Sequence, residues 1–233
     1  MVKKKKATRE HFLITQENPK SVVAEAYRTL RTNMGFTEMD RPCRTVLVTS
    51  VHPMEGKSTI TANLAVVMAQ AGHKVLVVDC DLRKPRQHQI FNVSNQSGLT
   101  NCLLNRATVA ETVHSSIADN FSLLTSGPIP PNPSEILSSE YTRAFWAGLK
   151  DHYNYIFIDS PPVLTVADAA ILSSQVDGVL LVFASGSTRI DHAREARDQL
   201  NKANAHIIGV VLNRAKIAKS KYQYYYYSSE ASI

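Results

Sequence analysis

Short apolar runs alternate along the chain with longer segments whose apolar residues recur at helical spacing. The runs have the length of strands and lie at residues 45–49, 74–78, 121–125, 155–158, 178–183 and 207–212. The segments expected to be helices lie at residues 58–70, 141–150, 166–174 and 190–202. Continuous apolar runs are typical of strands that are buried on both faces. The pattern therefore predicts an α/β fold, with a mostly parallel twisted sheet and helices on both of its faces.

A further amphipathic helix is expected near the N-terminus. It begins at Ser21, a residue suited to capping, and it ends before Asp40-Arg41-Pro42. Its apolar positions follow an i, i+4, i+7, i+11 pattern: Val23, Tyr27, Leu30 and Met34.

Two stretches lack a clear period. Residues 84–120 indicate only helical pieces, around Leu99, Leu103 and Leu104. Residues 127–133 contain four prolines, so a loop is expected there. Ser134 is expected to cap the helix that follows.

Length and composition fit one globular domain. The 233 residues are 44% hydrophobic and 20% charged, which is ordinary for a chain that buries a core. We expect a flexible basic N-terminus at residues 1–18, a folded domain at 19–215 and a flexible tail at 216–233. The net charge of +6 is concentrated in the two ends. These ends lack aromatic residues interleaved over a folded surface, so nucleic acid binding is not expected.

The three cysteines are Cys43, Cys80 and Cys102. They are odd in number and widely spaced, and no Cys-x-x-Cys pair occurs, so neither a zinc site nor a disulfide framework is indicated. A reduced, cytoplasmic setting fits best. The basic start is not followed by an apolar stretch, and no run approaches the ~18 apolar residues that a bilayer requires.

The first expected strand leads into Glu55-Gly56-Lys57-Ser58-Thr59. A Gly-Lys-Ser triplet is a weak signal alone, but here it stands before a helix, whose free N–H groups can face a phosphate. In that setting Lys57 would reach the β/γ oxygens and the Ser58 hydroxyl would bind Mg²⁺. The first glycine of the general loop pattern is replaced by Val51. A plain turn between strand and helix is the alternative.

Two other expected strands end in carboxylates. Asp79 and Asp81 lie two residues apart after the second run, so they point the same way from an extended chain. Asp159 follows another apolar run, where a nucleotide hydrolase has a water-mediated Mg²⁺ ligand. Ligands of parallel sheets bind beyond the carboxyl ends of the strands, so the three side chains are expected to converge there. Helix capping is the alternative for these aspartates.

The N-terminal helix carries Glu25, Arg28 and Arg31 at three-residue steps, away from its apolar side. Such a charged stripe is usually a solvated face. One glutamate beside two arginines also suits docking onto a partner subunit.

Five of the nine tyrosines lie in the last dozen residues: Tyr222, Tyr224, Tyr225, Tyr226 and Tyr227. A row of phenols on a chain with a phosphate-binding loop suggests that the tail is a substrate of phosphoryl transfer. Packing of an aromatic tail against a neighbouring subunit is the alternative.

Together these motifs resemble the bacterial tyrosine kinases, or BY-kinases, in the form found in Gram-positive bacteria. The similarity extends from about Ser21 to the tail. The matching motifs are Glu25-x-x-Arg28-x-x-Arg31, Gly56-Lys57-Ser58, Asp79-x-Asp81-x-Arg83, Asp159-x-Pro161-Pro162 and the tyrosine cluster. Met54 departs from the family, which usually has glycine before the acidic residue of the loop, and this bears on nucleotide affinity.

The resemblance implies a protein-tyrosine kinase that uses ATP and Mg²⁺ and phosphorylates tails in trans within a ring of subunits. It also implies recruitment to the inner face of the cell membrane by a transmembrane adaptor, and reversal by a tyrosine phosphatase. The family's usual role is control of capsular or exopolysaccharide synthesis and export, so proteins of that process are expected substrates.

The motifs give the residues expected roles. Lys57, Asp79 and Asp81 are expected to be catalytic, with Asp79 orienting or deprotonating the tyrosine hydroxyl. The division between Asp79 and Asp81 stays open. The expected Mg²⁺ ligands are Ser58, Asp81 and Asp159. The expected nucleotide-binding residues are Glu55, Gly56, Lys57, Ser58, Thr59 and Asn213, the last at a position that resembles the family's base contact.

Two other functions fit part of the pattern. A partition or septum-placement ATPase shares the fold and the acidic strand ends. It carries a signature lysine early in the loop, where this chain has His52-Pro53-Met54, and it lacks a tyrosine tail. A nucleotide-sensing scaffold that only binds the adaptor is the non-catalytic alternative.

Overall fold

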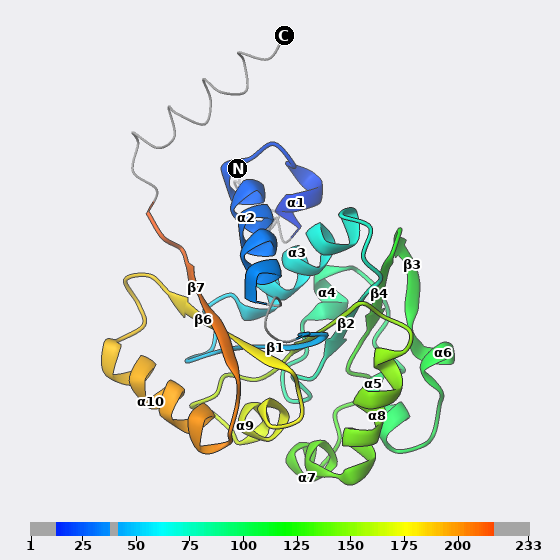
Figure 1. The fold of residues 1–233 in the computed structure, drawn as a ribbon. Helices are drawn as coiled ribbons and strands as arrows, with labels where there is room; N and C mark the ends of the chain where they lie inside the picture. Colours follow the sequence, from blue (N-terminus) through cyan, green and yellow to red (C-terminus); the bar gives the residue numbers. More distant parts are fainter. Residues whose placement is uncertain (1–12, 38–41, 217–233) are drawn as a thin grey trace, which may run out of the picture.

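The computed structural model describes residues 13–37 and 42–216. Within them, a seven-stranded sheet in the order β3-β4-β2-β5-β1-β6-β7 forms the centre of the molecule (Figure 1). The strands are β1 (Thr45–Ser50), β2 (Val75–Asp79), β3 (His114–Ala118), β4 (Phe121–Leu124), β5 (Tyr155–Asp159), β6 (Gly178–Ala184) and β7 (Ile207–Asn213). Only the β3–β4 pair is antiparallel. The predicted α/β fold with a mostly parallel sheet is confirmed.

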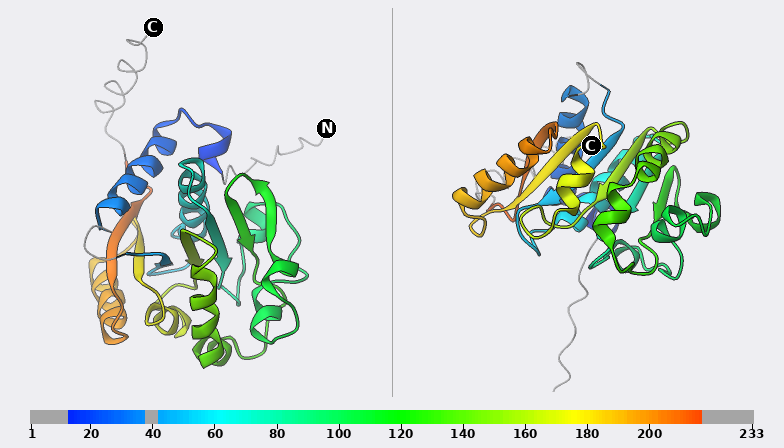
Figure 2. Two further views of the ribbon diagram at one scale, coloured as in Figure 1. Left: turned by 45° about the vertical axis from the view of Figure 1, so that its right-hand side comes forward. Right: turned by 90° about the horizontal axis from the view of Figure 1, so that it is seen from below.

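Helices cover both faces of the sheet (Figure 2). One face carries α1 (Ile14–Glu17), α2 (Val22–Thr37), α3 (Lys57–Gln70) and α4 (Gln87–Ile90). The other carries α5 (Leu99–Leu103), α6 (Val109–Thr112), α7 (Pro133–Ser138), α8 (Glu140–Lys150), α9 (Asp168–Ser173) and α10 (Ile190–Lys202). None of the described helices is long and apolar enough to cross a membrane.

Each face of the sheet has its own apolar core. Alternate strand residues such as Val46 and Leu47 point to opposite faces, and both are fully buried. Helix α3 is buried nearly all round because it lies between the sheet and α2. On the opposite face the core includes Trp146 of α8.

The expected strands and the four expected central helices all form, each within two residues of its predicted ends. Ser21 caps α2 as predicted, since its Oγ accepts the N–H of Ala24 at 3.1 Å. The cap predicted at Ser134 is wrong. Helix α7 already begins at Pro133, one residue before Ser134. Proline is well suited to the first turn of a helix, because the N–H group that it lacks would have no helical partner there.

Two further differences concern the N-terminus and the sheet edge. The predicted flexible segment 1–18 is wrong from residue 13 onward, because residues 14–17 form α1 and Thr15 is buried. The Thr15 N–H and hydroxyl both donate to Asn63 Oδ1, which ties α1 to α3. Residues 1–12 lie outside the described part. Strand β3 was not expected, because it is a partly exposed edge strand without an apolar run.

Strand register places the chemistry. Asp79 at the end of β2 pairs with Asp159 at the end of β5, and Asp159 pairs with Val48 of β1. The carboxyl ends of these three central strands therefore lie at one level, beside the N-terminus of α3.

Candidate active site

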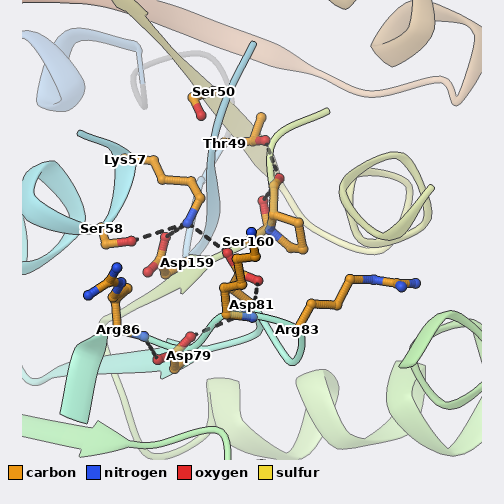
Figure 3. Close-up of polar contacts among 12 residues, drawn as sticks. Thr49, Ser50, Lys57, Ser58, Asp79, Asp81, Arg83, Arg86, Asp159 and Ser160 are labelled. Carbon is orange, nitrogen blue, oxygen red and sulfur yellow. Dashed lines mark hydrogen bonds and ion pairs between the residues drawn. The ribbon is translucent and has the colours of Figure 1, made fainter. Parts of the chain in front are cut away.

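Lys57 is the centre of the site (Figure 3). Its Nζ lies 2.9 Å from Asp81 Oδ2 and 3.5 Å from Asp159 Oδ1, and the Ser58 Oγ is 3.2 Å away. Burial lowers the pKa of Lys57, but the surrounding charges of Asp159, Asp81 and Asp79 outweigh it and raise the pKa above its usual value. The structure thus brings together the loop lysine and the three aspartates at the ends of β2 and β5.

Asp159 is fully buried at the end of β5. Its Oδ2 accepts a hydrogen bond from Gln87 Nε2 at 2.8 Å. Its Oδ1 has no well-formed hydrogen bond from the described residues, although the nearby Ser58 hydroxyl lowers the Asp159 pKa. Burial outweighs this effect and that of Lys57, so the pKa of Asp159 is raised. A buried, incompletely bonded carboxylate oxygen beside a hydroxyl is a position suited to a hard cation.

Asp79 and Asp81 have different surroundings. Asp79 is fully buried, and its Oδ2 accepts the N–H groups of Arg86 and Gln87, both at 2.9 Å, at the start of α4. Burial and then repulsion from Asp159 raise the pKa of Asp79 to about 8. Asp81 is 5% exposed, and it accepts from Lys57 and from the Lys84 N–H. Asp81 therefore lies closer to the open side of the site, while Asp79 holds the loop behind it.

The remaining loop residues form a closed turn. Glu55 Oε2 accepts the N–H groups of Val51 and His52 at 2.8 and 2.9 Å, and its Oε1 accepts the Thr188 hydroxyl. The Glu55 carboxylate thus closes the loop upon itself, and its role in nucleotide binding stays a prediction. Thr59 lies in the first turn of α3, and its role in nucleotide binding stays a prediction.

Asn213 packs directly against the phosphate loop. Its Nδ2 donates to the Glu55 carbonyl at 2.8 Å, and a Cβ built on Gly56 would lie 2.2 Å from the same nitrogen. Gly56 also has φ of +97°, so any other residue there would be both strained and blocked. The structure therefore places Asn213 at the edge of the predicted nucleotide site.

Known proteins are similar to this chain in sequence. Residues 44–187 match a family described as the AAA domain. The tyrosine-protein kinase YwqD of Bacillus subtilis is 44% identical over 91% of this chain and 90% of its own length. The putative tyrosine-protein kinase CapB of Staphylococcus aureus is 38% identical over 97% of this chain and 99% of its own.

Solved structures agree. The crystal structure of the chimerical protein CapA2B2 has a TM-score of 0.85 and 41% identity, covering 90% of this chain and 92% of that one. This chain belongs to the bacterial tyrosine kinases. The cell division ATPase MinD of Pyrococcus furiosus shares the P-loop fold, at a TM-score of 0.63 and 26% identity over 78% of the kinase and 79% of its own chain. Tyrosine kinase activity is therefore favoured over the partition-type alternative.

The kinase contains site residues that the sequence did not indicate. Gln87 is fully buried, and its Nε2 donates to both Asp159 and the Ser58 carbonyl at 2.8 and 3.1 Å. Its backbone N–H also binds Asp79, so one residue connects β2, β5 and α3. A glutamine in a short helix carries no motif, so only the fold brings it into the site.

Two more contacts hold the site from outside. Arg83 points away from Lys57 and binds Asp168 through Nε and Nη2 at 2.8 and 3.2 Å. Hydrogen bonding to Asp168 raises the pKa of Arg83. On the other side, His52 Nε2 lies 2.8 Å from His192 Nδ1, which links the phosphate loop to α10. Asp168 lies 85 residues from Arg83, and His192 lies 140 residues from His52.

The charged stripe on α2 is partly used within the kinase. Glu25 pairs with Arg28 at 2.6 Å, and Arg28 also donates to the Pro19 carbonyl. Arg31 donates to the Val67 carbonyl of α3 at 3.0 Å. Its predicted role in oligomerisation stays a prediction. The predicted phosphorylation sites Tyr222 and Tyr224–Tyr227 lie outside the described residues.

The three cysteines lie in the interior of the domain. Cys43, Cys80 and Cys102 are all buried and form no disulfide. Burial raises the pKa of both Cys80 and Cys102. All three thiols are part of the apolar cores.

Proposed function

We propose that this kinase transfers the γ-phosphoryl group of ATP to the tyrosines of a neighbouring subunit's tail, and so regulates capsular or exopolysaccharide synthesis and export. The observation that carries the proposal is the contact of Lys57 with Asp81 and Asp159 at the common end of three strands. One cation and several carboxylates at a helix N-terminus suit a nucleotide phosphate with its cation. The tyrosine tail supplies the acceptor hydroxyls.

The residues present fit a magnesium ion together with ATP. No three His, Cys, Asp or Glu side chains among residues 13–37 and 42–216 form a complete metal cage. This suits Mg²⁺, which is usually held by one or two carboxylates and substrate phosphates. Ser58 and Asp159 would hold it, with Asp81 beside them. When bound, the ion neutralises charge on the β- and γ-phosphate oxygens.

The chain's own groups then position the reaction. The phenol oxygen forms a bond to the γ-phosphorus, the bond from that phosphorus to the β–γ bridging oxygen breaks, and ADP leaves. Lys57 stabilises the charge that develops on the transferred group. The phenol proton passes to a carboxylate of the Asp79–Asp81 pair.

We assign that proton to Asp81, although the sequence favours Asp79. Asp79 is enclosed and both of its oxygens accept backbone N–H groups, from Arg86, Gln87 and, at 3.3 Å, Asp81. Asp81 is the more exposed of the two and reaches Lys57. Asp81→Asn should lower phosphorylation by about 10²-fold or more while the nucleotide Kd changes only a few-fold. A greater loss in Asp79→Asn than in Asp81→Asn, at equal folded fraction, would reverse the assignment.

Assembly and location follow the family pattern. The subunits form a ring through the α2 stripe of Glu25, Arg28 and Arg31, in which Glu25 is the half-exposed member of an ion pair. The cytoplasmic tail of a transmembrane adaptor recruits the kinase to the inner face of the membrane. A tyrosine phosphatase reverses the modification. Each phosphate adds about −1.5 to −2 charges to the tail, so repulsion from the acidic site releases it and loosens the ring.

The decisive experiment is an anti-phosphotyrosine blot of the kinase, with and without the adaptor. Lys57→Met should abolish tail phosphotyrosine and leave the far-UV circular dichroism unchanged, whereas Lys202→Met, an exposed lysine on α10, should change neither. Undiminished phosphotyrosine in Lys57→Met would end the proposal. Adaptor binding without any phosphotyrosine in the wild type would point to the nucleotide-sensing scaffold.

A further inference from the structure

A groove lies at the sheet edge between α10 and the last two strands, β6 and β7, whose places in the fold are shown in Figure 1. Its volume is about 670 Å³. The floor is apolar and comes from β6 and β7, with Leu181, Phe183, Val210 and Leu212 as its main side chains. Val210 and Leu212 are 54% and 58% exposed, which is unusual for large apolar residues on a sheet face under a helix.

The helix side of the groove is basic. Ile190, Arg194, Arg197 and Asn201 line it at i, i+4, i+7 and i+11, within about 60° of helical arc. The acidic residues of α10 lie about 70–130° from the centre of this stripe: Asp191, Glu195 and Asp198. Arg194 has no ion pair with a described residue, and Arg197 pairs only with its exposed neighbour Asp198. The groove therefore combines an apolar floor with two available guanidinium groups.

The chain leaves the domain at this edge. β7 is the last strand of the sheet and ends at Asn213, and the described residues end at Lys216. The 17 residues that follow carry the five tyrosines. Six extended residues span about 20 Å, so Tyr222 and its neighbours can reach the groove from Lys216.

We propose that this groove binds the phosphorylated tail of the same chain, an inference that rests on the proposed phosphorylation of the tail. A phosphotyrosine has a flat apolar ring and a dianionic end. The floor accepts the ring, and Arg194 and Arg197 bind the phosphate oxygens through charge-assisted hydrogen bonds. The unmodified tail carries Lys219, Lys221 and Glu230, so it offers these arginines no excess of negative charge. Phosphorylation makes the tail strongly negative and so creates the attraction.

The consequence is a switch with two tail positions. Before transfer, the tail is free to enter a neighbour's active site. After transfer, its own groove holds it, and it no longer competes for the site of another subunit. As phosphorylation proceeds, the groove would hold more of the phosphorylated tails, and fewer tails would remain inserted in neighbouring active sites.

The first test measures binding without relying on kinase activity. The full chain with all five tail tyrosines changed to phenylalanine is titrated against labelled synthetic peptides of residues 217–233, unmodified or phosphorylated at Tyr225. Fluorescence anisotropy should show binding of the phosphopeptide only. Arg194→Gln and Arg197→Gln should each weaken it about tenfold. Arg143→Gln, an exposed arginine on α8, should leave it unchanged.

Two controls separate other binding modes. Excess Mg²⁺ and ADP should not compete, which distinguishes the groove from the active site. The phosphorylated wild-type chain should not bind added phosphopeptide at any protein concentration, and phosphatase treatment followed by phosphatase removal should restore binding. Equal binding of the two peptides, or binding that survives both arginine substitutions, overturns the proposal. Binding by the phosphorylated wild type would overturn the intramolecular site and indicate a phosphotyrosine from another chain.

Failure of the proposed function is visible separately. The blot could show no phosphotyrosine on the tail while the synthetic phosphopeptide still binds. In that case the groove is a phosphotyrosine-binding site, but the proposal that the chain's own tail is its ligand is overturned. If tail phosphotyrosine forms but the peptide does not bind, only the groove is excluded.

Discussion

Asp177 at one end of the sheet is partly buried and Asp79 at the other is fully buried, and the two are expected to have opposite effects on stability. At the amino end of β1, Asp177 accepts the N–H of Thr45, the Thr45 hydroxyl and the Lys150 ammonium, at 2.8 to 2.9 Å. Burial raises the Asp177 pKa, but these hydrogen bonds outweigh it, so the pKa is lowered. At the carboxyl end, burial and Asp159 raise the pKa of Asp79. The Asp177 carboxylate at the amino end therefore stabilises the fold, whereas the carboxylates at the other end are expected to destabilise it.

The difference between the two aspartates reflects the role of each end of the sheet, structural at the amino end and catalytic at the carboxyl end. A carboxylate with a full set of donors is favourable in its charged form. Three carboxylates around one lysine are short of positive charge, which a bound cation would supply. The active site is thus expected to be destabilising until its ligands arrive, as functional sites often are.

Asp177→Ala should have the largest effect on stability. It removes the acceptor for Arg44, Thr45 and Lys150 while leaving the active site at the far end of the strands. We expect a loss of about 2–3 kcal/mol in the free energy of unfolding, measured with urea, and unchanged activity per folded molecule. Asp198→Ala, which breaks an exposed ion pair, should change stability by less than about 0.5 kcal/mol. Equal losses in the two variants would contradict the comparison.

Asp79→Asn should act in the opposite direction. The asparagine Oδ1 can still accept the N–H groups of Arg86 and Gln87, and only the 3.3 Å bond from the Asp81 N–H is lost. The substitution removes the cost of keeping a carboxyl group whose pKa is raised by burial and by Asp159. We expect a gain of about 1–3 kcal/mol at pH 7 in the nucleotide-free kinase. Differential scanning calorimetry with and without Mg²⁺ and an ATP analogue measures this, and the ligands should stabilise the wild type more than the variant. Destabilisation comparable to Asp177→Ala would show that Asp79 is a purely structural carboxylate. The exposed substitution Asp151→Asn is the matched control.

The two aspartates should also differ in their pH windows. Asp79 has a raised pKa, so its contribution is favourable below its unfolded value of 3.8 and is lost as the pH rises toward about 8. Asp177 has a lowered pKa, so its contribution is present above the unfolded value and is lost as the pH falls through the folded value. Urea titrations from pH 3 to 8 should show the Asp79→Asn gain growing across the neutral range. The Asp177→Ala loss should stay constant there and shrink only in acid. Identical profiles would refute the assignment of opposite causes.

The sequence predicted the site's charged members because a strand followed by a loop or an acid is visible in one stretch of chain. It did not predict Gln87, Asp168 or His192, whose partners lie 72, 85 and 140 residues away. Such contacts depend on how the elements pack. The β3 strand was missed for a related reason: an edge strand needs no continuous apolar run. Thr15 lies in a segment expected to be flexible, and its hydrogen bonds to Asn63, 48 residues away, were likewise not visible in the local sequence.

Met54 adds a smaller, local destabilisation to the carboxyl end. Its φ of +66° lies in the left-handed region, its side chain is 86% exposed, and its carbonyl accepts Arg214 Nη2 at 2.7 Å. That conformation costs about 1–2 kcal/mol for a residue with a Cβ, whereas the greater freedom of glycine in the unfolded chain costs about 0.5–1 kcal/mol. Met54→Gly should therefore raise stability by up to about 1 kcal/mol, and fluorescent ADP binding should show whether the loop also gains affinity. Met54→Ala keeps the Cβ and should give no gain in either measurement. An equal gain with alanine would mean that the exposed side chain, and not the backbone, is the cause.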